Sequence, residues 1–444
     1  MTLSSQIKQR IAEFQVTVID NPYIPHEPTE KQAKFLFQSD YLEGFYGGAA
    51  RGGKLLSLDT PIPTPNGWKL NGELKDGDIV FDEKGTPCKI IKAFDPEIPE
   101  IAYNLTFDDH SQIIAGAEHL WLTLDAKEMT QLTRRTPEFR AKRRAKRPSR
   151  VGGNKSKIFT KIIQIRNSKN PPHTKSIPTG TIRNTQEIFD TLRTKSGRTN
   201  HAIPVSAPLQ LPEAKLPLDP YILGLWLGDG TSASGSFTTA DIEIVQAFAF
   251  FDVHKRSGKY DYGTFGLSPI LRQLKLLKNK HIPLIYLRAS AKQRLALLQG
   301  LMDTDGTVSD NGYSEFTTTN KRLADGILDL ICGLGWKARI VKGRAMLYGK
   351  DCGIKYNIKW TPSELVFRLN RKLIKQRIAC KRTTKFRYIV GCERVTPVLM
   401  RCIKVDSPSG LYLAGKSMIP THNTDALLMA ALQYVTIPNY AALL

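Results

Sequence analysis

The 444-residue sequence contains no pair of cysteines at the C-x-x-C spacing, no signal-peptide pattern and no long apolar run. Its six cysteines stand apart, at Cys88, Cys332, Cys352, Cys380, Cys392 and Cys402. This spacing excludes a zinc ribbon and a secreted disulfide framework, so we expect reduced thiols, any one of which could be a nucleophile. A membrane-spanning helix needs roughly 20 apolar residues, and no run approaches that length. The sequence therefore predicts a cytoplasmic protein.

Acidic residues are also scarce. Asp and Glu number 41 against 64 Lys and Arg, which gives a formal net charge of +23. A strongly basic balance predicts a polyanionic partner, most simply nucleic acid. Residues 134–150 hold nine basic residues and one Glu. This run is typical either of a phosphate-contacting surface or of a solvated loop.

Three textures follow one another along the chain. Residues 56–95 contain short β-like runs separated by Pro, Asn-Gly and Asp-Gly, the pattern of a small all-β domain. Residues 215–375 alternate helical and β-like patterns, as an α/β domain does. Residues 395–423 return to the first texture. We therefore expect a multidomain protein in which a mostly-β domain is split by an α/β domain.

A phosphate-binding loop is interrupted at the start of this insertion. Gly48, Gly53 and Lys54 match the pattern G-x-x-x-x-G-K-[ST], but Leu55 stands where the hydroxyl residue belongs. Thr424 opens a helical pattern far downstream. Joining Lys54 to Thr424 completes the motif between a strand and a helix, which marks residues 55–423, 369 residues long, as an insertion.

The insertion resembles an intein, a segment that excises itself and ligates its flanks. Its opening, "LSLDTPIPTPNGW", and its end, "MIPTHNT", are similar to the terminal blocks of inteins. The resemblance implies a Hint-type splicing domain. Leu55 cannot act as the usual first nucleophile. Trp121, Cys402 and Thr421 resemble the signature of class 3 inteins, which dispense with that nucleophile.

The resemblance also implies a mechanism that needs no cofactor. The Cys402 thiolate attacks the Lys54 carbonyl while His119, in "AGAEHLWLT", protonates the leaving amide nitrogen. The Thr424 hydroxyl then takes the acyl group, and Asn423 cyclises with help from His422. Two expected side chains are missing: Gly116 replaces a Thr that donates a hydrogen bond, and Gly410 replaces a further His.

Two stretches within the α/β segment resemble the LAGLIDADG signature of homing endonucleases, "ILGLWLGDG" (222–230) and "LQGLMDTDG" (298–306). The resemblance implies two helices in close contact through small residues, at Gly224 and Gly300. It also makes Asp229 and Asp305 the catalytic acids that hold Mg²⁺. The first copy has Leu227 where the second has Asp303, so the two copies are not identical there.

Lys280 resembles a lysine that polarises the scissile phosphate, or it is surface charge. The implied substrate is double-stranded DNA, the intein-less version of the host gene. The two pseudo-repeats imply a monomeric nuclease. The stretch 174–198 and the run 134–150 are expected to add a DNA-gripping surface.

The flanks resemble the ATPase end of a phage terminase large subunit, in a phage-infected or lysogenic bacterial cell. ATP and Mg²⁺ would bind only after splicing, through Gly48, Gly53, Lys54 and Thr424. The expected domains follow in chain order: upstream flank 1–54, splicing domain 55–130, basic DNA-contacting insertion 131–214, endonuclease 215–378, splicing domain 379–423 and downstream flank 424–444.

Two alternatives remain at this point. The insertion could be a non-splicing remnant in which Leu55 replaced an essential nucleophile, leaving only DNA binding or cleavage. The chain could instead be a nucleic-acid motor with an insertion, but an interrupted phosphate-binding loop cannot wrap phosphates.

Overall fold

The computed structural model describes residues 54–135, 180–309, 313–376 and 382–423. Both flanks of the predicted insertion, with Gly48, Gly53 and Thr424, lie outside this range, as do most of the basic run 134–150 and Cys380. The described cysteines are free thiols, as expected from their spacing. Within the described ranges no helix is long and apolar enough to cross a membrane.

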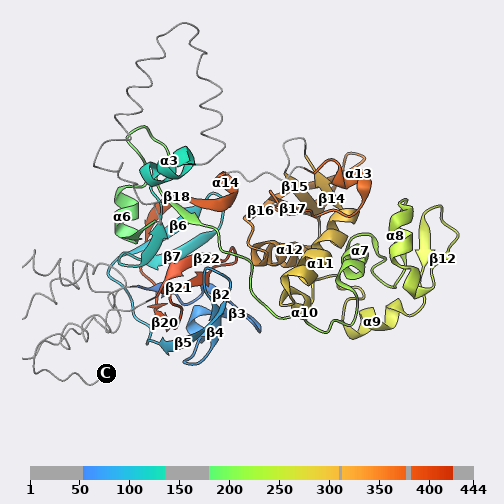
Figure 1. Cartoon of the computed structure of the whole chain (residues 1–444), viewed down its shortest axis with the longest axis horizontal. Coiled ribbons are helices and arrows are strands. Elements are labelled where there is room, and N and C mark those ends of the chain that lie inside the picture. Colours follow the sequence, from blue (N-terminus) through green and yellow to red (C-terminus); the bar gives the residue numbers. More distant parts are fainter. Residues whose placement is uncertain (1–53, 136–179, 310–312, 377–381, 424–444) are drawn as a thin grey trace, which may run out of the picture.

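The described residues form two adjoining bodies (Figure 1). The first is mostly β and draws on both ends of the segment 55–423. Its upstream elements are β1 (Leu56–Ser57), β2 (Pro61–Thr64), β3 (Gly67–Leu70), η1 (Asn71–Glu73), β4 (Ile79–Phe81), β5 (Pro87–Ala93), β6 (Ala102–Phe107), β7 (Gln112–Gly116), β8 (Leu120–Thr123), α3 (Ala126–Arg135), β9 (Thr181–Asn184), α6 (Thr185–Asp190) and β10 (Ala202–Pro204). Its downstream elements are α14 (Arg382–Lys385), β18 (Phe386–Val395), β19 (Met400–Arg401), β20 (Ile403–Val405), β21 (Leu411–Ala414) and β22 (Ile419–His422).

Strands from the two chain ends are interleaved in this first body. The largest sheet has the order β10-β18-β6-β7-β1-β19, and β20 adds to β5 and β4 in a second sheet. One apolar core collects side chains from both ends, among them Leu56, Ile113, Ile403 and Ile419. The split of a mostly-β domain that the sequence predicts is therefore present in the core.

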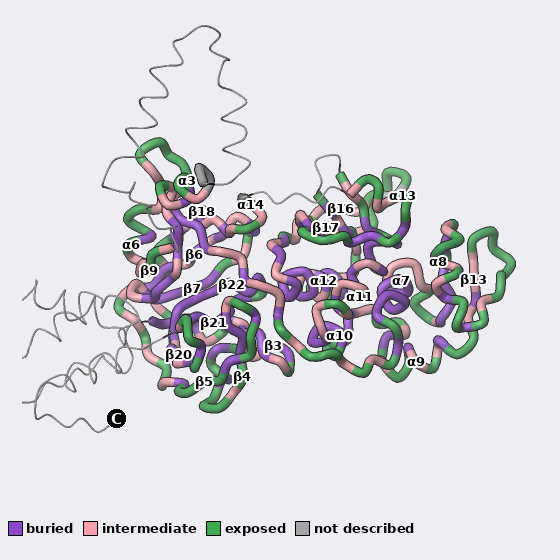
Figure 2. Tube along the Cα trace, viewed as in Figure 1, coloured by how far each residue is buried: buried purple, intermediate pink, exposed green. Residues whose placement is uncertain are grey.

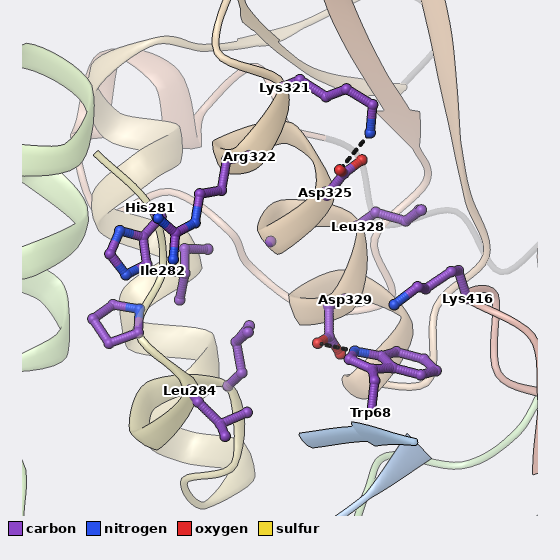
Figure 3. A pocket seen from close by; sticks show the side chains of 13 residues that line it. Trp68, His281, Ile282, Leu284, Lys321, Arg322, Asp325, Leu328, Asp329 and Lys416 are labelled. Atoms are coloured by element: carbon purple, nitrogen blue, oxygen red, sulfur yellow. Dashed lines mark hydrogen bonds and ion pairs between the residues drawn. The ribbon is translucent and has the colours of Figure 1, made fainter. Parts of the chain in front are cut away.

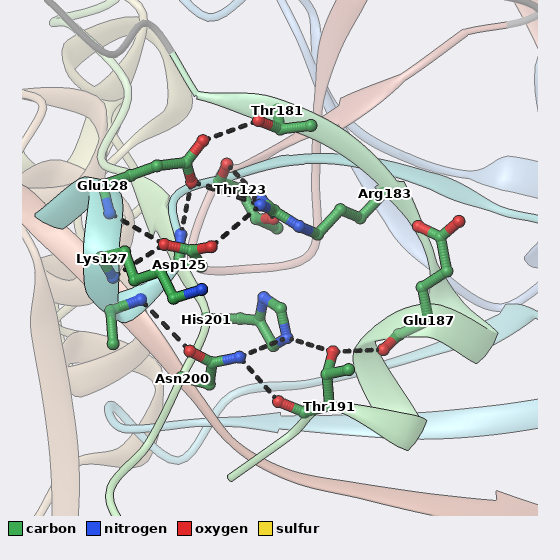
Figure 4. Close-up of polar contacts among 11 residues, drawn as sticks. Thr123, Asp125, Lys127, Glu128, Thr181, Arg183, Glu187, Thr191, Asn200 and His201 are labelled. Carbon is green, nitrogen blue, oxygen red and sulfur yellow. Dashed lines mark hydrogen bonds and ion pairs between the residues drawn. The ribbon is translucent and has the colours of Figure 1, made fainter. Parts of the chain in front are cut away.

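Part of the range 131–214 also enters this core. Ile188 of α6 and Ile203 of β10 are fully buried in it, and β9 pairs with β8. Figure 4 shows the polar contacts around this pairing: the Arg183 guanidinium donates to the Thr123 carbonyl oxygen (3.1 Å) and lies beside Asp125, which precedes α3, and Glu128 in the first turn of α3. Residues 181–204 thus contribute to the core of the first body.

The second body contains two helices packed face to face and a four-stranded sheet. Its elements are α7 (Pro220–Asp229), β11 (Phe237–Thr238), α8 (Ile242–Ala247), η2 (Ala249–Phe251), β12 (His254–Lys255), β13 (Asp261–Gly263), α9 (Leu267–Gln273), α10 (Leu284–Leu287), α11 (Ala291–Thr304), β14 (Gly306–Val308), β15 (Ser314–Thr318), α12 (Lys321–Gly333), β16 (Ala338–Leu347), β17 (Lys350–Trp360) and α13 (Asn370–Leu373). Its larger sheet has the order β14-β15-β17-β16. Figure 2 shows α7 and α11 buried and the β12–β13 tip exposed.

Sequence rules explain where α7 and α11 begin. The Asp219 carboxylate accepts from the backbone amides of Tyr221 and Ile222, and Pro220 occupies the first turn, where a missing amide hydrogen costs nothing. Ser290 and Gln293 form a capping box at the start of α11. Helix α7 is buried from Pro220 to Leu227, where every residue is apolar or small, whereas α11 buries about half of its residues, mainly in its second half.

The two bodies meet along a polar and apolar seam. Phe81, Leu413 and Met418 of the first body share a buried cluster with Leu209 and Cys332. Beside this cluster is a cleft of about 730 Å³ between Trp68, Lys416 and helix α12 (Figure 3). The Trp68 indole nitrogen donates to Asp329 Oδ2 at 2.8 Å. The second body is therefore joined to the hairpin β21–β22 by packed side chains.

Candidate functional site

The upstream junction, Lys54–Leu55, comes immediately before β1, which pairs with the strand that precedes Cys402. Leu56 pairs with Arg401 in the antiparallel β1–β19 register. Continuing this register places Leu55 opposite Cys402, and opposite residues in such a pair have Cα atoms about 4.5–5.5 Å apart. Leu55 and Cys402 share one buried apolar cluster with Ala102 and Met400. Cys402, the nucleophile predicted from the sequence, therefore lies beside the predicted scissile bond between Lys54 and Leu55.

His119 occupies the other side of this junction. It is fully buried between Trp121, whose ring meets it edge-on at a centroid distance of 4.8 Å, and Thr421. The His119 Nε2 atom and the Thr421 hydroxyl share a hydrogen bond. His119 Nδ1 lacks a partner of good geometry among the described residues, and the backbone of Lys54 is a nearby polar group. Trp121 and Thr421 thus both contact His119, which lies near the Lys54 backbone, while Cys402 lies in the cluster of Leu55.

The electrostatics of His119 are dominated by burial. Removal from water lowers the pKa of His119 to about 3, although the Lys54 backbone favours the protonated form. His119 is therefore a neutral imidazole at pH 7, which changes the role that the sequence predicts for it. The neutral ring carries no extra proton at pH 7. It must accept a proton before it can donate one to the leaving nitrogen.

Trp121 and Thr185 hold His119 in place. The Trp121 indole nitrogen donates to Thr185 Oγ1 at 3.0 Å, and the Thr185 amide and hydroxyl both donate to the His119 carbonyl oxygen. Thr185 was not identified from the sequence, because it lies in a polar stretch without a motif. Gly116, which stands where the sequence comparison expects a Thr, donates its backbone amide to the Leu55 carbonyl oxygen at 3.0 Å.

The downstream junction is held by the hairpin β21–β22. His422 Nδ1 donates to the Asn423 carbonyl oxygen at 2.8 Å, so the imidazole lies at the carbonyl that cyclisation attacks. The Asn423 side-chain nitrogen donates to the Val405 carbonyl oxygen at 3.0 Å, and the Asn423 amide donates to the Gly410 carbonyl oxygen at 2.7 Å. The nucleophilic nitrogen is therefore bonded to another strand.

Gly410 leaves no room for the histidine that many inteins have there. Its φ of +65° favours glycine. A Cβ atom at this position would lie 2.9 Å from Asn423 Oδ1 and 3.2 Å from His422 Cε1. The space that a histidine side chain would occupy at position 410 is therefore filled by the side chains of His422 and Asn423.

In the second body, α7 and α11 make contact through their glycines. A Cβ atom on Gly224 would lie 2.9 Å from the Gly300 Cα atom, so any side chain there would force the helices apart. This contact confirms the sequence prediction of close helix packing, and it carries Asp229 and Asp305 to the same end of the helix pair. Asp303 is buried, and it accepts from Tyr221 Oη (2.8 Å) and from backbone amides, so it is structural.

The two acids influence each other. Burial and the nearby Asp305 carboxylate raise the pKa of Asp229 to about 6, and partial burial raises the pKa of Asp305 as well. Two like charges held close together with hard oxygen donors suit a divalent cation. Within the described ranges, no group of three or more His, Cys, Asp or Glu side chains could hold a metal, so further ligands would have to come from water, backbone or DNA.

A lysine lies at the end of each helix. Lys280 Nζ donates to the Leu227 (3.0 Å) and Gly228 (2.9 Å) carbonyl oxygens, and burial lowers its pKa to about 8. Lys280 is therefore partly buried and held at the end of α7 by these carbonyl oxygens. Lys372 Nζ donates in the same way to the carbonyl oxygens of Met302, Thr304 and Gly306. The sequence offers no signal for Lys372, because it lies among other basic residues.

The chain is similar to several known proteins. Residues 292–376 match the model of the LAGLIDADG-like domain. A replicative DNA helicase DnaB of Mycobacterium intracellulare is 36% identical over 377 residues, 84% of this chain and 59% of the relative. A replicative DNA helicase DnaB of Mycobacterium leprae (strain TN) is 37% identical over 71 residues, 16% of this chain and 12% of that relative. The chain thus spans less than two thirds of either relative.

Among solved structures, the chain is similar to the MchDnaB-1 intein (13% identity, 83% of this chain and 99% of that one, TM-score 0.25) and to the gp41-1 intein (30% identity, 16% and 52%, TM-score 0.15). These TM-scores are too low for any inference about the fold.

Both relatives are named as helicases and neither as a terminase, so the prediction of a phage terminase host is corrected. Residues 292–376, from α11 to the segment after α13, form a LAGLIDADG-like domain.

Proposed function

We propose that residues 55–423 are a class 3 intein that excises itself and joins Lys54 to Thr424, and that the intein carries a homing endonuclease. The observation that carries the proposal is the position of Cys402 beside Leu55 in one buried cluster. The contacts of His119 with Thr421 and of His422 with Asn423 add a proton-transfer group at each junction. The two similar solved structures named above are both titled as inteins.

The first step forms a thioester. Neutral His119 takes the proton of the Cys402 thiol, and the sulfur attacks the Lys54 carbonyl carbon. The same imidazole returns the proton to the Leu55 nitrogen as the Lys54–Leu55 bond breaks. A histidine of lowered pKa suits this exchange, because it gives up the proton readily once it holds it.

The later steps occur at the hairpin β21–β22. The Thr424 hydroxyl attacks the thioester, which transfers residues 1–54 to the downstream segment and regenerates the thiol. The Asn423 side-chain nitrogen then attacks its own carbonyl carbon, which His422 polarises. The bond from this nitrogen to Val405 delays cyclisation, since it must break first. The resulting ester rearranges to a Lys54–Thr424 peptide bond.

The second proposed activity is cleavage of double-stranded DNA at the intein-less host gene. Asp229 and Asp305 would hold Mg²⁺, which stabilises the negative charge of the transition state. Lys280 and Lys372 lie at the same helix ends and supply positive charge there. The name of the relatives supports a replicative helicase of the DnaB type as the host, acting on DNA in the bacterial cytoplasm.

Incubation of the purified chain and mass measurement of the products test the splicing proposal. Splicing yields a 369-residue product from residues 55–423 and a ligated 75-residue product from residues 1–54 and 424–444. A chain that stays at 444 residues under all conditions would be a non-splicing remnant, the alternative proposed from Leu55.

A further inference from the structure

Asn71 is a polar side chain in a place where polar side chains are rare. It begins η1 and has no exposed surface, in the apolar surroundings of β1 and β19. Burying an amide group without partners costs free energy, so a buried amide is normally fully hydrogen-bonded. Asn71 uses only its nitrogen, because its Oδ1 has no hydrogen-bond partner among the described residues. The Asn71 side chain therefore acts in the fold as a hydrogen-bond donor, through Nδ2.

All contacts of this nitrogen are with the two strands at the upstream junction. Asn71 Nδ2 lies 3.0 Å from the Leu56 carbonyl oxygen and 3.1 Å from the Arg401 carbonyl oxygen, with a longer contact of 3.4 Å to Ser57. Leu56 and Arg401 are the directly paired residues of β1 and β19. One amide thus bridges the last rung before Leu55 and Cys402.

β1 and β19 are two residues long each, and one further backbone bond, from the Leu58 amide to the Leu399 carbonyl oxygen (3.2 Å), joins the same two segments. On their other sides, β1 pairs with β7 and Met400 pairs with Glu97. A side chain of β19 also bonds to the η1 turn. The Arg401 guanidinium donates to the carbonyl oxygens of Gly72 (3.0 Å) and Leu74 (2.8 Å), on either side of Glu73. Turn η1 and strand β19 therefore hold each other in one register. A slip of this register would move the Cys402 sulfur relative to the Lys54 carbonyl.

We propose that Asn71 is the positioning residue of the first splicing step: its amide clamps β1 to β19 and so holds the Cys402 thiol within reach of the Lys54 carbonyl. Asn71 touches neither reacting atom, and it acts through the two strands. The inference rests on the proposed splicing function. It predicts that the upstream and downstream cleavages respond differently when the amide is removed.

The test uses the full chain with Asn71→Leu, which keeps the volume of the side chain and removes its donors. Release of residues 1–54 by an added thiol reports the thioester, and release of residues 424–444 reports Asn423 cyclisation. We expect the first to fall by about tenfold or more, because a shift of about 1 Å costs up to 10²-fold in rate. The second should stay within about twofold. Asn104→Leu on β6, whose Oδ1 also lacks a partner, is the matched control.

A second measurement tests the relative position of residues 55 and 402 independently of the splicing reaction. Leu55→Cys places a thiol opposite Cys402, at a distance that suits a disulfide, and air oxidation traps it in folded molecules. We expect the disulfide to form at least about threefold more slowly when Asn71→Leu is added. Equal loss of both cleavages, or unchanged cleavage and trapping in Asn71→Leu, would overturn the inference. A wild-type chain that never splices would instead refute the proposed function, while the trapping result would still report on the clamp.

Discussion

Cys402 packs against Leu55 in a cluster of four buried apolar residues, although the two residues belong to opposite ends of the segment 55–423. Their proximity depends on two short antiparallel strands. The thiol is 1% exposed, so it meets the peptide bond at the junction away from bulk water. The consequences for splicing can be tested one residue at a time.

Removal of the proposed nucleophile should separate the two cleavages. In Cys402→Ala, release of residues 1–54 should fall by at least about 10³-fold, because no other group replaces the sulfur. Cleavage after Asn423 should persist, since the His422–Asn423 contact is untouched. Mass measurement over time shows both products. Cys392→Ala, another buried thiol, is the control, and normal splicing of Cys402→Ala would refute the class 3 assignment.

The depressed pKa of His119 predicts a pH dependence of stability. Unfolding exposes His119 and returns its pKa to about 6.5, so between about pH 3 and 6.5 the unfolded chain binds the extra proton. The free energy of unfolding should therefore rise with pH across this window, by at most about 1.4 kcal/mol per pH unit from this group. The stabilisation is present above pH 6.5 and is lost as the pH falls.

Denaturant titrations of wild type and His119→Gln at several pH values measure this effect. The slope between pH 4 and 6 should be smaller in the variant. Identical slopes would mean that His119 is not held neutral by the fold.

A side chain at Gly410 should block the downstream step. In Gly410→Ala, the new methyl group meets Asn423 Oδ1 and the His422 ring, and we expect release of residues 424–444 to slow about tenfold or more. Gly349→Ala is a matched control, because Gly349 has a φ of +75° and open space around it. Both variants should lose about 1 kcal/mol from the left-handed backbone. An equally slow Gly349→Ala would assign the effect to backbone strain alone.

The nuclease acids should be separable from splicing. Asp229→Asn and Asp305→Asn should each lower Mg²⁺-dependent DNA cleavage by about 10³-fold while the splicing products are unchanged. Asp303→Asn, which weakens a buried acceptor of backbone amides, should instead lower the melting temperature. Cleavage assays on DNA of the intein-less junction, with and without EDTA, distinguish these outcomes. Persistent cleavage in both acid variants would remove them from the site.

The seam between the bodies predicts a large stability effect from one carboxylate. Asp329 is paired with the buried Arg288 at 3.1 Å and accepts from Trp68. Asp329→Asn leaves the Arg288 charge without its counter-ion and should cost about 3–5 kcal/mol of unfolding free energy. Asp325→Asn removes only an exposed pair with Lys321 and should cost less than about 1 kcal/mol. Denaturant unfolding compares the two, and equal effects would contradict the assignment.

The sequence indicates the reacting groups better than it indicates their supports. His119, Trp121, Cys402 and Thr421 could be selected because each lies in a recognisable block. In the structure His119 contacts Trp121 and Thr421, and Cys402 lies in the cluster of Leu55. Asn71 and Lys372 could not be selected, because each acts by donating to backbone carbonyls that only the fold brings near. The neutral state of His119 also depends on burial that no motif encodes. The flanks and Thr424 lie outside the described residues, so their roles stay predictions.

The shared cluster of Phe81, Leu413 and Met418 with Leu209 and Cys332 also limits how the chain can be shortened. Deleting the LAGLIDADG-like body would leave three large apolar side chains facing water, next to the turn that presents the downstream junction. A minimal derivative would therefore aggregate unless these positions were replaced by polar residues at the same time.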